Sequence, residues 1–240
     1  MSPFDIPIYI VNYNNEERRQ RMIDRFSQFN ITPILTPQVE TNDTRLTLAP
    51  TNCKRIWAIM LQHLDSIRHY YENSSSPYCI VCEDDVHISK TFTDDVHELL
   101  PSLETMQLDL ILLGYLLPYK IDMSTHLHKQ HFPIIGQTPK FNLHRFPDDI
   151  WGCQMYLFTK GYAEAMLKLY TIEYALANID HLNFNPDWTL TKNGNRVLIC
   201  PMIAVEEGVN VSGDKEQADY HTRCHRLNYG GQLSPITLWL

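Results

Sequence analysis

The chain has 240 residues, of which 44% are hydrophobic and 20% are charged, and these proportions are typical of a folded globular protein. They exclude a disordered tail, a coiled coil and a collagen-like rod. The net charge of −8 argues against nucleic acid as a partner, because a phosphate backbone is bound by a basic face. Glycine is scarce, with 9 residues and no G-x-G-x-x-G motif. A bound nucleotide must therefore be held without a glycine-rich loop.

The first half of the chain alternates between predicted strands and predicted helices. Apolar runs of strand length predict buried strands, and apolar residues at steps of three and four predict amphipathic helices. In chain order we expect a strand over 6–12, a helix over 16–29, a strand over 31–35, a loop over 36–50, a helix over 51–71, a strand over 78–82, a helix over 93–103 and a strand over 108–113. This alternation predicts a mostly parallel sheet.

The second half is less regular. Residues 119–149 show no clear period and are expected to form a long loop, with a hairpin as a possible part of it. A strand is expected over 151–159, a helix over 161–170, a short helix over 187–192 and a strand over 196–200, followed by an irregular tail from residue 205. The sequence shows no internal repeat and no linker, so we expect a single domain over 1–240.

The expected location is the cytoplasm. The first residues, MSPFDIPIYIVN, carry no basic segment before their apolar stretch, so no secretory signal is expected. The most apolar window, 108–117, is too short to cross a bilayer, so no transmembrane segment is expected. The six cysteines are scattered and are expected to be reduced thiols. Cys79 and Cys82 form a C-x-x-C pair, which fits the core of a strand better than a redox or zinc site.

Three consecutive carboxylates, Glu83, Asp84 and Asp85, directly follow the apolar run YCIVC. Ligands of an open parallel sheet bind at the carboxyl ends of its strands. Clustered carboxylates repel one another unless a cation is bound, and their hard oxygens suit Mg²⁺ or Mn²⁺. Such a metal can hold a diphosphate without a glycine loop. The alternative is a solvated acidic turn.

Four segments, in their order, resemble the glycosyltransferase family 25 group, which includes lipooligosaccharide and procollagen sugar transferases. They are the first strand with its arginines (IYIVNYNNEERRQRM), the strand with EDDV at 79–86, the strand LDLILLG at 108–114, and WGCQMYLFTKGYAEAML at 151–167. His63 lies twenty residues before Glu83, where the family has a Ser-His pair, and Gln62 replaces that serine.

The resemblance implies a GT-A fold, which is a Rossmann-like α/β fold with a mostly parallel central sheet flanked by helices. It implies a metal-dependent glycosyltransferase that moves a sugar from a nucleotide-sugar donor, expected to be a UDP-sugar, to the hydroxyl of a glycan acceptor. Glu83 and Asp85 would fill the D-x-D-type motif for Mn²⁺ or Mg²⁺. Asp85 is expected to contact the metal directly, while Asp84 or Glu83 holds the ribose or a metal-bound water.

Other donor contacts are expected next to the first strand. Asn12 and Tyr13 follow that strand and are candidate neighbours of the nucleobase or ribose. Arg18 and Arg21 are either contacts of the diphosphate or surface charges paired with the glutamates of their own helix.

A carboxylate must accept the proton of the acceptor hydroxyl if the sugar inverts. Asp187, in the segment NPDW, is the leading candidate for this base, and Asp149 or Asp148 is the rival. The structural alternative for Asp187 is a helix N-cap.

Five further side chains have both a structural and a functional interpretation. His63 is expected to be a buried core histidine. His221 and His225 are expected to be surface histidines, with a metal or phosphate contact as the alternative. Trp151 and Trp188 either pack or stack on a sugar.

Two other functions are compatible with the sequence. A non-catalytic carbohydrate- or partner-binding module could keep the fold, and the departures from the family at Gln62 and beyond residue 201 motivate this alternative. A metal-dependent phosphoryl-transfer enzyme could use the same acidic triplet, although the chain lacks a convincing phosphate-binding loop.

Overall fold

A computed structural model describes residues 4–11, 15–117, 121, 131–148, 150–180, 182–207, 215–224 and 240. The strands of its main sheet are β1 (Ile8–Val11), β2 (Ile34–Leu35), β3 (Tyr78–Glu83), β5 (Leu110–Leu116), β6 (Ile134–Gln137), β7 (Asn142–His144), β8 (Trp151–Thr159) and β9 (Arg196–Cys200). A separate two-stranded ribbon consists of β4 (Val86–Ile88) and β10 (Ala204–Glu206). The helices are α1 (Glu16–Ser27), the short 3₁₀ helix η1 (Thr44–Leu46), α2 (Lys54–Asn73), α3 (Phe92–Thr105), α5 (Lys160–Leu169), α6 (Ile172–Ala177), α7 (Pro186–Thr189) and α8 (Lys215–Cys224).

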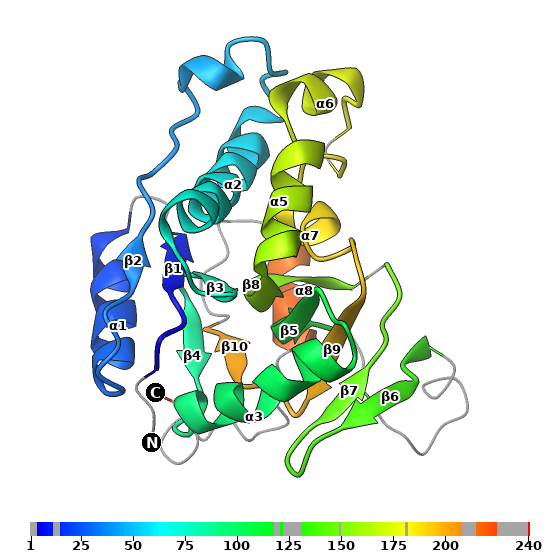
Figure 1. The fold of residues 1–240 in the computed structure, drawn as a ribbon. Helices are drawn as coiled ribbons and strands as arrows, with labels where there is room; N and C mark the ends of the chain where they lie inside the picture. The colour runs from blue at the N-terminus through cyan, green and yellow to red at the C-terminus, as the bar shows by residue number, and fades with distance from the viewer. Residues whose placement is uncertain are drawn as a thin grey trace.

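The main sheet has eight strands in the order β2-β1-β3-β8-β5-β9-β7-β6 (Figure 1). The pairs β1–β2, β1–β3 and β5–β9 are parallel, whereas β8 and β7 are antiparallel to both of their neighbours. The α/β fold with a mostly parallel, Rossmann-like central sheet is therefore confirmed. The direction of β8 has no signature in the sequence, because an apolar run looks the same in a parallel and an antiparallel central strand.

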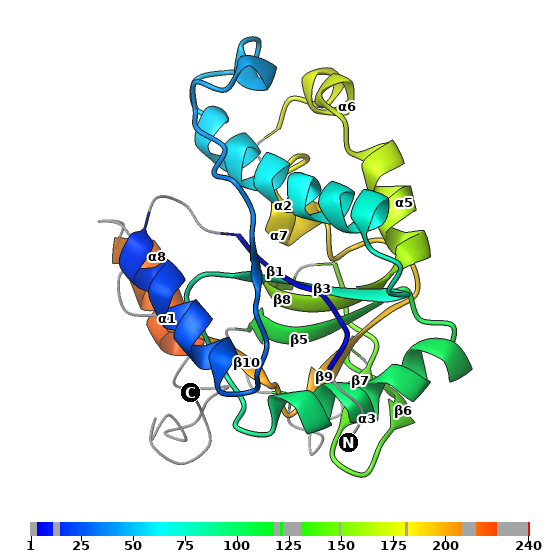
Figure 2. The same ribbon diagram turned by 60° about the vertical axis from the view of Figure 1, so that its left-hand side comes forward.

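Both faces of the sheet are covered by helices (Figures 1 and 2). On one face, Tyr9 and Val11 of β1 pack in a cluster with buried residues of α2 and α5. On the other face, Ile8 and Ile10 pack in a cluster with buried residues of α1 and α3. Successive residues of a strand point to opposite faces, so a strand buried on both sides is apolar at every position. This is why continuous apolar runs marked β1, β3, β5 and β8 in the sequence.

Most of the expected elements are present, and the differences lie in short or polar segments. The region 119–149 contributes the hairpin of β6 and β7. The ribbon of β4 and β10 and the helices α6 and α8 were not expected. β4 and β10 have three residues each, too few to show a period. Within the described residues, no helix combines the length and the apolar character that crossing a membrane requires.

The C-x-x-C pair lies in the core. Cys79 and Cys82 belong to β3 and pack in the clusters on opposite faces of the sheet. Residues three apart in a strand point to opposite faces, so the two thiols cannot bind one metal or form a disulfide with each other. The prediction of a core strand is confirmed.

Candidate functional site

The acidic triplet lies at the carboxyl end of β3. Glu83 is the last residue of β3 and pairs with Val11, the last described residue of β1, in parallel register. The two strands therefore end at the same edge of the sheet, where ligands of open α/β sheets bind. Asn12 and Tyr13, the expected nucleobase or ribose neighbours, follow β1 directly and lie outside the described residues.

The ribbon of β4 and β10 brings a second acidic pair to this edge. Glu206 pairs with Val86 in antiparallel register, and the backbone N–H of Glu207 donates to the carbonyl of Asp85 at 2.6 Å. Sequence reasoning missed Glu206 and Glu207. The signal was present, because the segment MIAVEE at 202–207 repeats the pattern of an apolar run that ends in acids, as YCIVCEDD does.

Four carboxylates interact electrostatically at this edge, and we call Glu83, Asp85, Asp187 and Glu206 the acidic cluster. Burial and the negative charges of Asp187, Asp85 and Glu206 raise the pKa of Glu83 well above its usual range. Burial, together with Glu206 and Asp84, raises the pKa of Asp85 to about 7 even though Arg18 opposes the shift. Burial also raises the pKa of Asp187. The repulsion shows that these carboxylates share one local environment.

One buried oxygen of the acidic cluster, on Asp85, has no hydrogen-bond partner among the described residues. Asp85 Oδ2 accepts a hydrogen bond from Arg18 at 3.0 Å. Its other oxygen, Oδ1, is buried and accepts no hydrogen bond from any described residue. An unsatisfied buried carboxylate oxygen is costly, and a cation bound beside it would remove that cost. The donor set of carboxylate oxygens fits Mn²⁺ or Mg²⁺.

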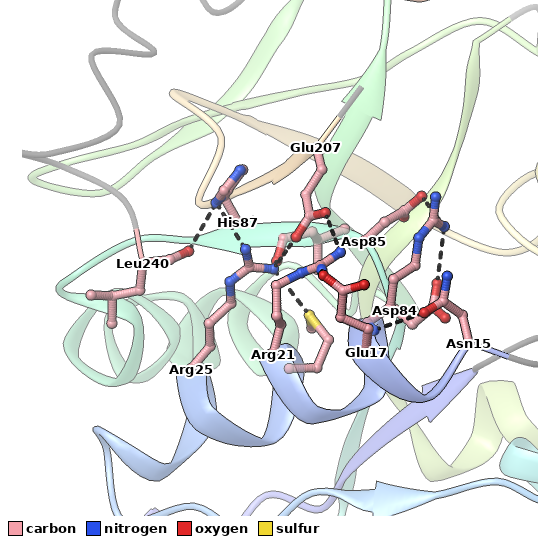
Figure 3. Close-up of polar contacts among 12 residues, drawn as sticks. Asn15, Glu17, Arg21, Arg25, Asp84, Asp85, His87, Glu207 and Leu240 are labelled. Atoms are coloured by element: carbon pink, nitrogen blue, oxygen red, sulfur yellow. Dashed lines mark hydrogen bonds and ion pairs between the residues drawn. The ribbon is translucent and has the colours of Figure 1, made fainter. Parts of the chain in front are cut away.

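Three arginines of α1 form ion pairs with carboxylates at the same edge, and Figure 3 shows two of them, Arg21 and Arg25, beside Glu207. Arg18 forms ion pairs with Asp85 and, at 3.4 Å, with Asp84. These contacts place Arg18 at the acidic triplet and not in a surface pair with a glutamate of its own helix.

Arg21 and Arg25 of α1 surround one carboxylate. Arg21 binds both Glu17, at 2.8 Å, and Glu207, at 3.0 Å, so it combines the two expected roles of a surface pair and a site contact. Arg25 binds Glu207 at 2.7 Å and the carbonyl of Val86 at 2.8 Å. The helix thereby supplies positive charge along the rim of the acidic cluster.

Asp187 reaches the cluster from α7. Asn185 is the N-cap of this helix, because its Oδ1 accepts the N–H of Asp187 at 3.0 Å. The alternative of Asp187 as the N-cap is therefore wrong. Asp187 Oδ1 instead accepts the backbone N–H of Cys153 in β8 at 3.1 Å, which orients its carboxylate against the sheet. Its electrostatic coupling to Glu83 places it within the acidic cluster.

Asp148, one of the two rival base residues, points into solvent. Asp148 has a side chain that is 82% exposed and forms an ion pair with Arg196. Asp149 lies outside the described residues. Trp151 and Trp188 pack against each other edge to face, with ring centroids 4.8 Å apart.

His63 is fully buried, so the prediction of a core histidine is confirmed. Its Nδ1 lies 3.0 Å from the hydroxyl of Tyr156, and its Nε2 lies 3.9 Å from Sγ of Cys153. The thiol of Cys153 donates to Oε1 of Glu83 at 3.3 Å. A chain of polar contacts thus runs from the core to the acidic cluster. The adjacent Gln62 is also buried and donates to the carbonyl of Thr36 at 3.2 Å.

His221 is not a surface residue, and the expectation of scattered surface histidines is wrong for it. The residue lies in α8, is 9% exposed, and its Nδ1 is 2.8 Å from Oε2 of Glu206. This hydrogen bond raises the pKa of His221. Helix α8 is polar and lacks apolar residues at helical spacing, so its packing at this edge could not be predicted from the sequence. His225 lies outside the described residues.

Comparison with known proteins adds no assignment: neither the protein-family models nor the curated proteins give a match to this sequence. The site must therefore be interpreted from its own chemistry. It combines at least four carboxylates with arginine and histidine groups at the carboxyl edge of a sheet, an arrangement that can hold a divalent cation together with an anionic ligand.

Proposed function

We propose that the chain is a metal-dependent glycosyltransferase of the GT-A type. It transfers a sugar from a nucleotide-sugar donor, a UDP-sugar, to a hydroxyl of a glycan acceptor. The observation that carries this proposal is the acidic cluster, with its unsatisfied Asp85 Oδ1, at the carboxyl edge of a Rossmann-like sheet. The order of sequence segments shared with glycosyltransferase family 25 supports it.

Asp85 and Glu83 are the residues that would hold Mn²⁺ or Mg²⁺ in this enzyme. When bound, the metal supplies Lewis-acid stabilisation of the charge that develops on a leaving diphosphate. Arg18 already lies beside Asp84 and Asp85, and its guanidinium can donate to a phosphate oxygen in the same place. We assign Arg18 to the diphosphate and Asp84 to the ribose.

Asp187 is the carboxylate that we assign as base for the acceptor hydroxyl. Burial raises the pKa of Asp187 toward neutral pH, and a base with a pKa nearer the working pH accepts a proton more effectively. The backbone N–H and the thiol of Cys153 both hydrogen-bond to the carboxylate of Asp187, and these bonds fix its orientation. Trp188 belongs to α7, as Asp187 does, and packs against Trp151. This pair of rings can form an apolar wall for the sugar.

We place the enzyme in the cytoplasm. All six cysteines are free thiols in the structure, and reduced thiols are the norm in that compartment.

The test is ligand-induced thermal stabilisation. Mn²⁺ or Mg²⁺ together with UDP should raise the melting temperature, because ligands that bind only the folded state stabilise it by mass action. Asp85→Asn should abolish this shift, whereas Asp94→Asn, an exposed carboxylate of α3, should retain it. The absence of any shift across a panel of nucleoside diphosphates and metals would refute the proposal.

A non-catalytic module that keeps the fold is the second candidate, and Arg18 is the observation that favours it. Its guanidinium pairs with both Asp84 and Asp85 and offsets part of their charge without a metal, as a site that has lost its metal would require. Slow hydrolysis of UDP-sugars in the absence of acceptor supports the transferase. Nucleotide binding without any hydrolysis supports the module.

A further inference from the structure

Three side chains of different chemistry converge beneath the acidic cluster. His63 comes from α2, Glu83 from the end of β3 and Cys153 from β8. One ligand atom from each of these residues lies within 4.8 Å of the other two. They arrive from three separate elements of the fold, and none of these pairs is close in sequence. Imidazole, carboxylate and thiol together are the donor types found in zinc sites.

Two of the three donor separations are close to those of a tetrahedral zinc site. Bond lengths of about 2.3 Å to sulfur and about 2.0–2.2 Å to nitrogen or oxygen imply that sulfur lies about 3.6 Å from each neighbouring ligand atom. In the structure, Cys153 Sγ lies 3.9 Å from His63 Nε2 and 3.3 Å from Glu83 Oε1. Both distances differ from the tetrahedral value by a few tenths of an ångström. The ligand atoms of His63 and Glu83 lie within 4.8 Å of each other, so these two side chains must move closer together where that separation exceeds the tetrahedral value.

The imidazole of His63 is oriented and neutral, as a metal ligand must be. The hydroxyl of Tyr156 lies 3.0 Å from Nδ1. When Nδ1–H donates to this oxygen, the lone pair of Nε2 faces Cys153. A hydrogen bond at the second ring nitrogen is the usual way in which proteins fix the tautomer of a ligating histidine. Burial lowers the pKa of His63 to about 3, which keeps the ring uncharged at neutral pH.

We propose that His63, Glu83 and Cys153 form a zinc site with its fourth position open toward the acidic cluster. On binding, the Cys153 S–H bond breaks, its proton passes to solvent, and a zinc–thiolate bond forms. The thiolate and the carboxylate neutralise both charges of Zn²⁺, and the imidazole adds none. A thiolate and an imidazole select Zn²⁺ over Mn²⁺ and Mg²⁺, which prefer oxygen ligands. The site is thus distinct from the Asp85 metal of the proposed transferase, although Glu83 contributes to both.

The first test uses Co²⁺ as a coloured substitute for Zn²⁺ in the full chain. One equivalent should give a thiolate-to-cobalt charge-transfer band in the near ultraviolet and the visible bands of tetrahedral cobalt. Cys153→Ala and His63→Gln should each lose the charge-transfer band or weaken Co²⁺ binding at least tenfold. Cys79→Ala removes a buried thiol on the same face of the sheet and should leave the spectrum unchanged. Asp85→Asn should also retain the band, so failure of the transferase proposal is distinguishable.

The second test needs no variant and remains informative if the Cys153 substitution impairs folding. X-ray absorption at the zinc edge of the wild-type protein, loaded with one equivalent of Zn²⁺, should show one sulfur at about 2.3 Å and nitrogen or oxygen ligands at about 2.0–2.2 Å. A shell of nitrogen and oxygen alone would overturn the proposal. Retention of the cobalt charge-transfer band in Cys153→Ala, or its absence from the wild type, would do the same.

Discussion

Gly114 of β5 is the position at which a single methyl group should disturb the site through packing. A Cβ atom built at this residue would lie 2.6 Å from the carbonyl oxygen of Ala204 in β10 and 3.2 Å from its Cβ. The first contact is well inside van der Waals distance, and its partner is backbone, which cannot rotate away. The N–H of Ile203 also donates to the carbonyl of Leu113 at 3.1 Å. That bond holds the two segments together and must lengthen if they separate.

We expect Gly114→Ala to lower the free energy of unfolding by about 1–2 kcal/mol. Overpacking costs about 1–3 kcal/mol, and the reduced entropy of the unfolded chain returns about 0.4–1 kcal/mol where alanine can adopt the backbone conformation. Ala204 begins the strand that carries Glu206, so the displacement should also weaken binding of Mn²⁺ and UDP.

The assay is urea unfolding followed by circular dichroism, with the midpoint and the m-value both fitted. Gly161→Ala is the matched control, because the nearest atom that its new Cβ would meet outside the adjacent residues and the backbone of its own helix, Thr159 Oγ1, lies 4.0 Å away. Gly161 lies in the first turn of α5, where alanine is the better helix former, so this variant should be neutral or stabilised by up to about 1 kcal/mol. A Gly114→Ala protein that unfolds at the wild-type midpoint with an unchanged m-value would refute the packing argument.

Two further substitutions test a buried titration and a helix cap. Burial lowers the pKa of His144, whose Nδ1–H donates to the carbonyl of Phe132 at 2.9 Å while Nε2 has no partner among the described residues. The unfolded chain therefore binds a proton at this histidine at a higher pH than the folded chain does. The free energy of unfolding should fall as the pH drops below the pKa of the unfolded histidine, by at most about 1.4 kcal/mol per pH unit. His144→Asn keeps a donor without titrating, so its urea midpoint should fall less between pH 7.5 and pH 5.5, and equal losses would contradict this. Asn185→Ala removes the N-cap of α7 and should lower the unfolding free energy by about 1 kcal/mol, whereas Asn185→Asp should not; equal midpoints for the two variants would contradict the cap.

The sequence carried enough information to predict the sheet but not its edge. β3 and β8 are apolar at nearly every position because both of their faces are buried, and that property is visible without a structure. The ribbon that completes the edge was missed because the hydrogen bonds that create β4 come from β10, more than one hundred residues later. A three-residue strand is defined by its partner and not by its own composition.

The same distinction applies to the candidate site. Glu83, Asp84 and Asp85 were identified because three adjacent acids after an apolar run are unusual and local. Cys153 resembled any other apolar core position of β8, and its contact with Glu83 depends on β8 lying next to β3 in the sheet. His221 could not be assigned because α8 is polar and its contact with Glu206 is a tertiary one.

The distribution of cations around the acidic cluster identifies Glu83 as its decisive member. Arg18 lies beside Asp85, His221 beside Glu206, and Lys192 attracts Asp187. The one hydrogen bond that Glu83 accepts from the described residues comes from the neutral thiol of Cys153. Its charge is therefore the least compensated of the four, and burial together with its carboxylate neighbours raises its pKa well above the usual range.

A divalent ion can relieve this charge from either of two sides. On the side of Asp85 the ligands are oxygens, and on the side of Cys153 they are sulfur and nitrogen. Hard ions such as Mn²⁺ prefer the first set and Zn²⁺ the second. Because one carboxylate serves both positions, a metal bound on one side removes a ligand from the other. The identity of the ion, and not a change of fold, then determines which group Glu83 supports.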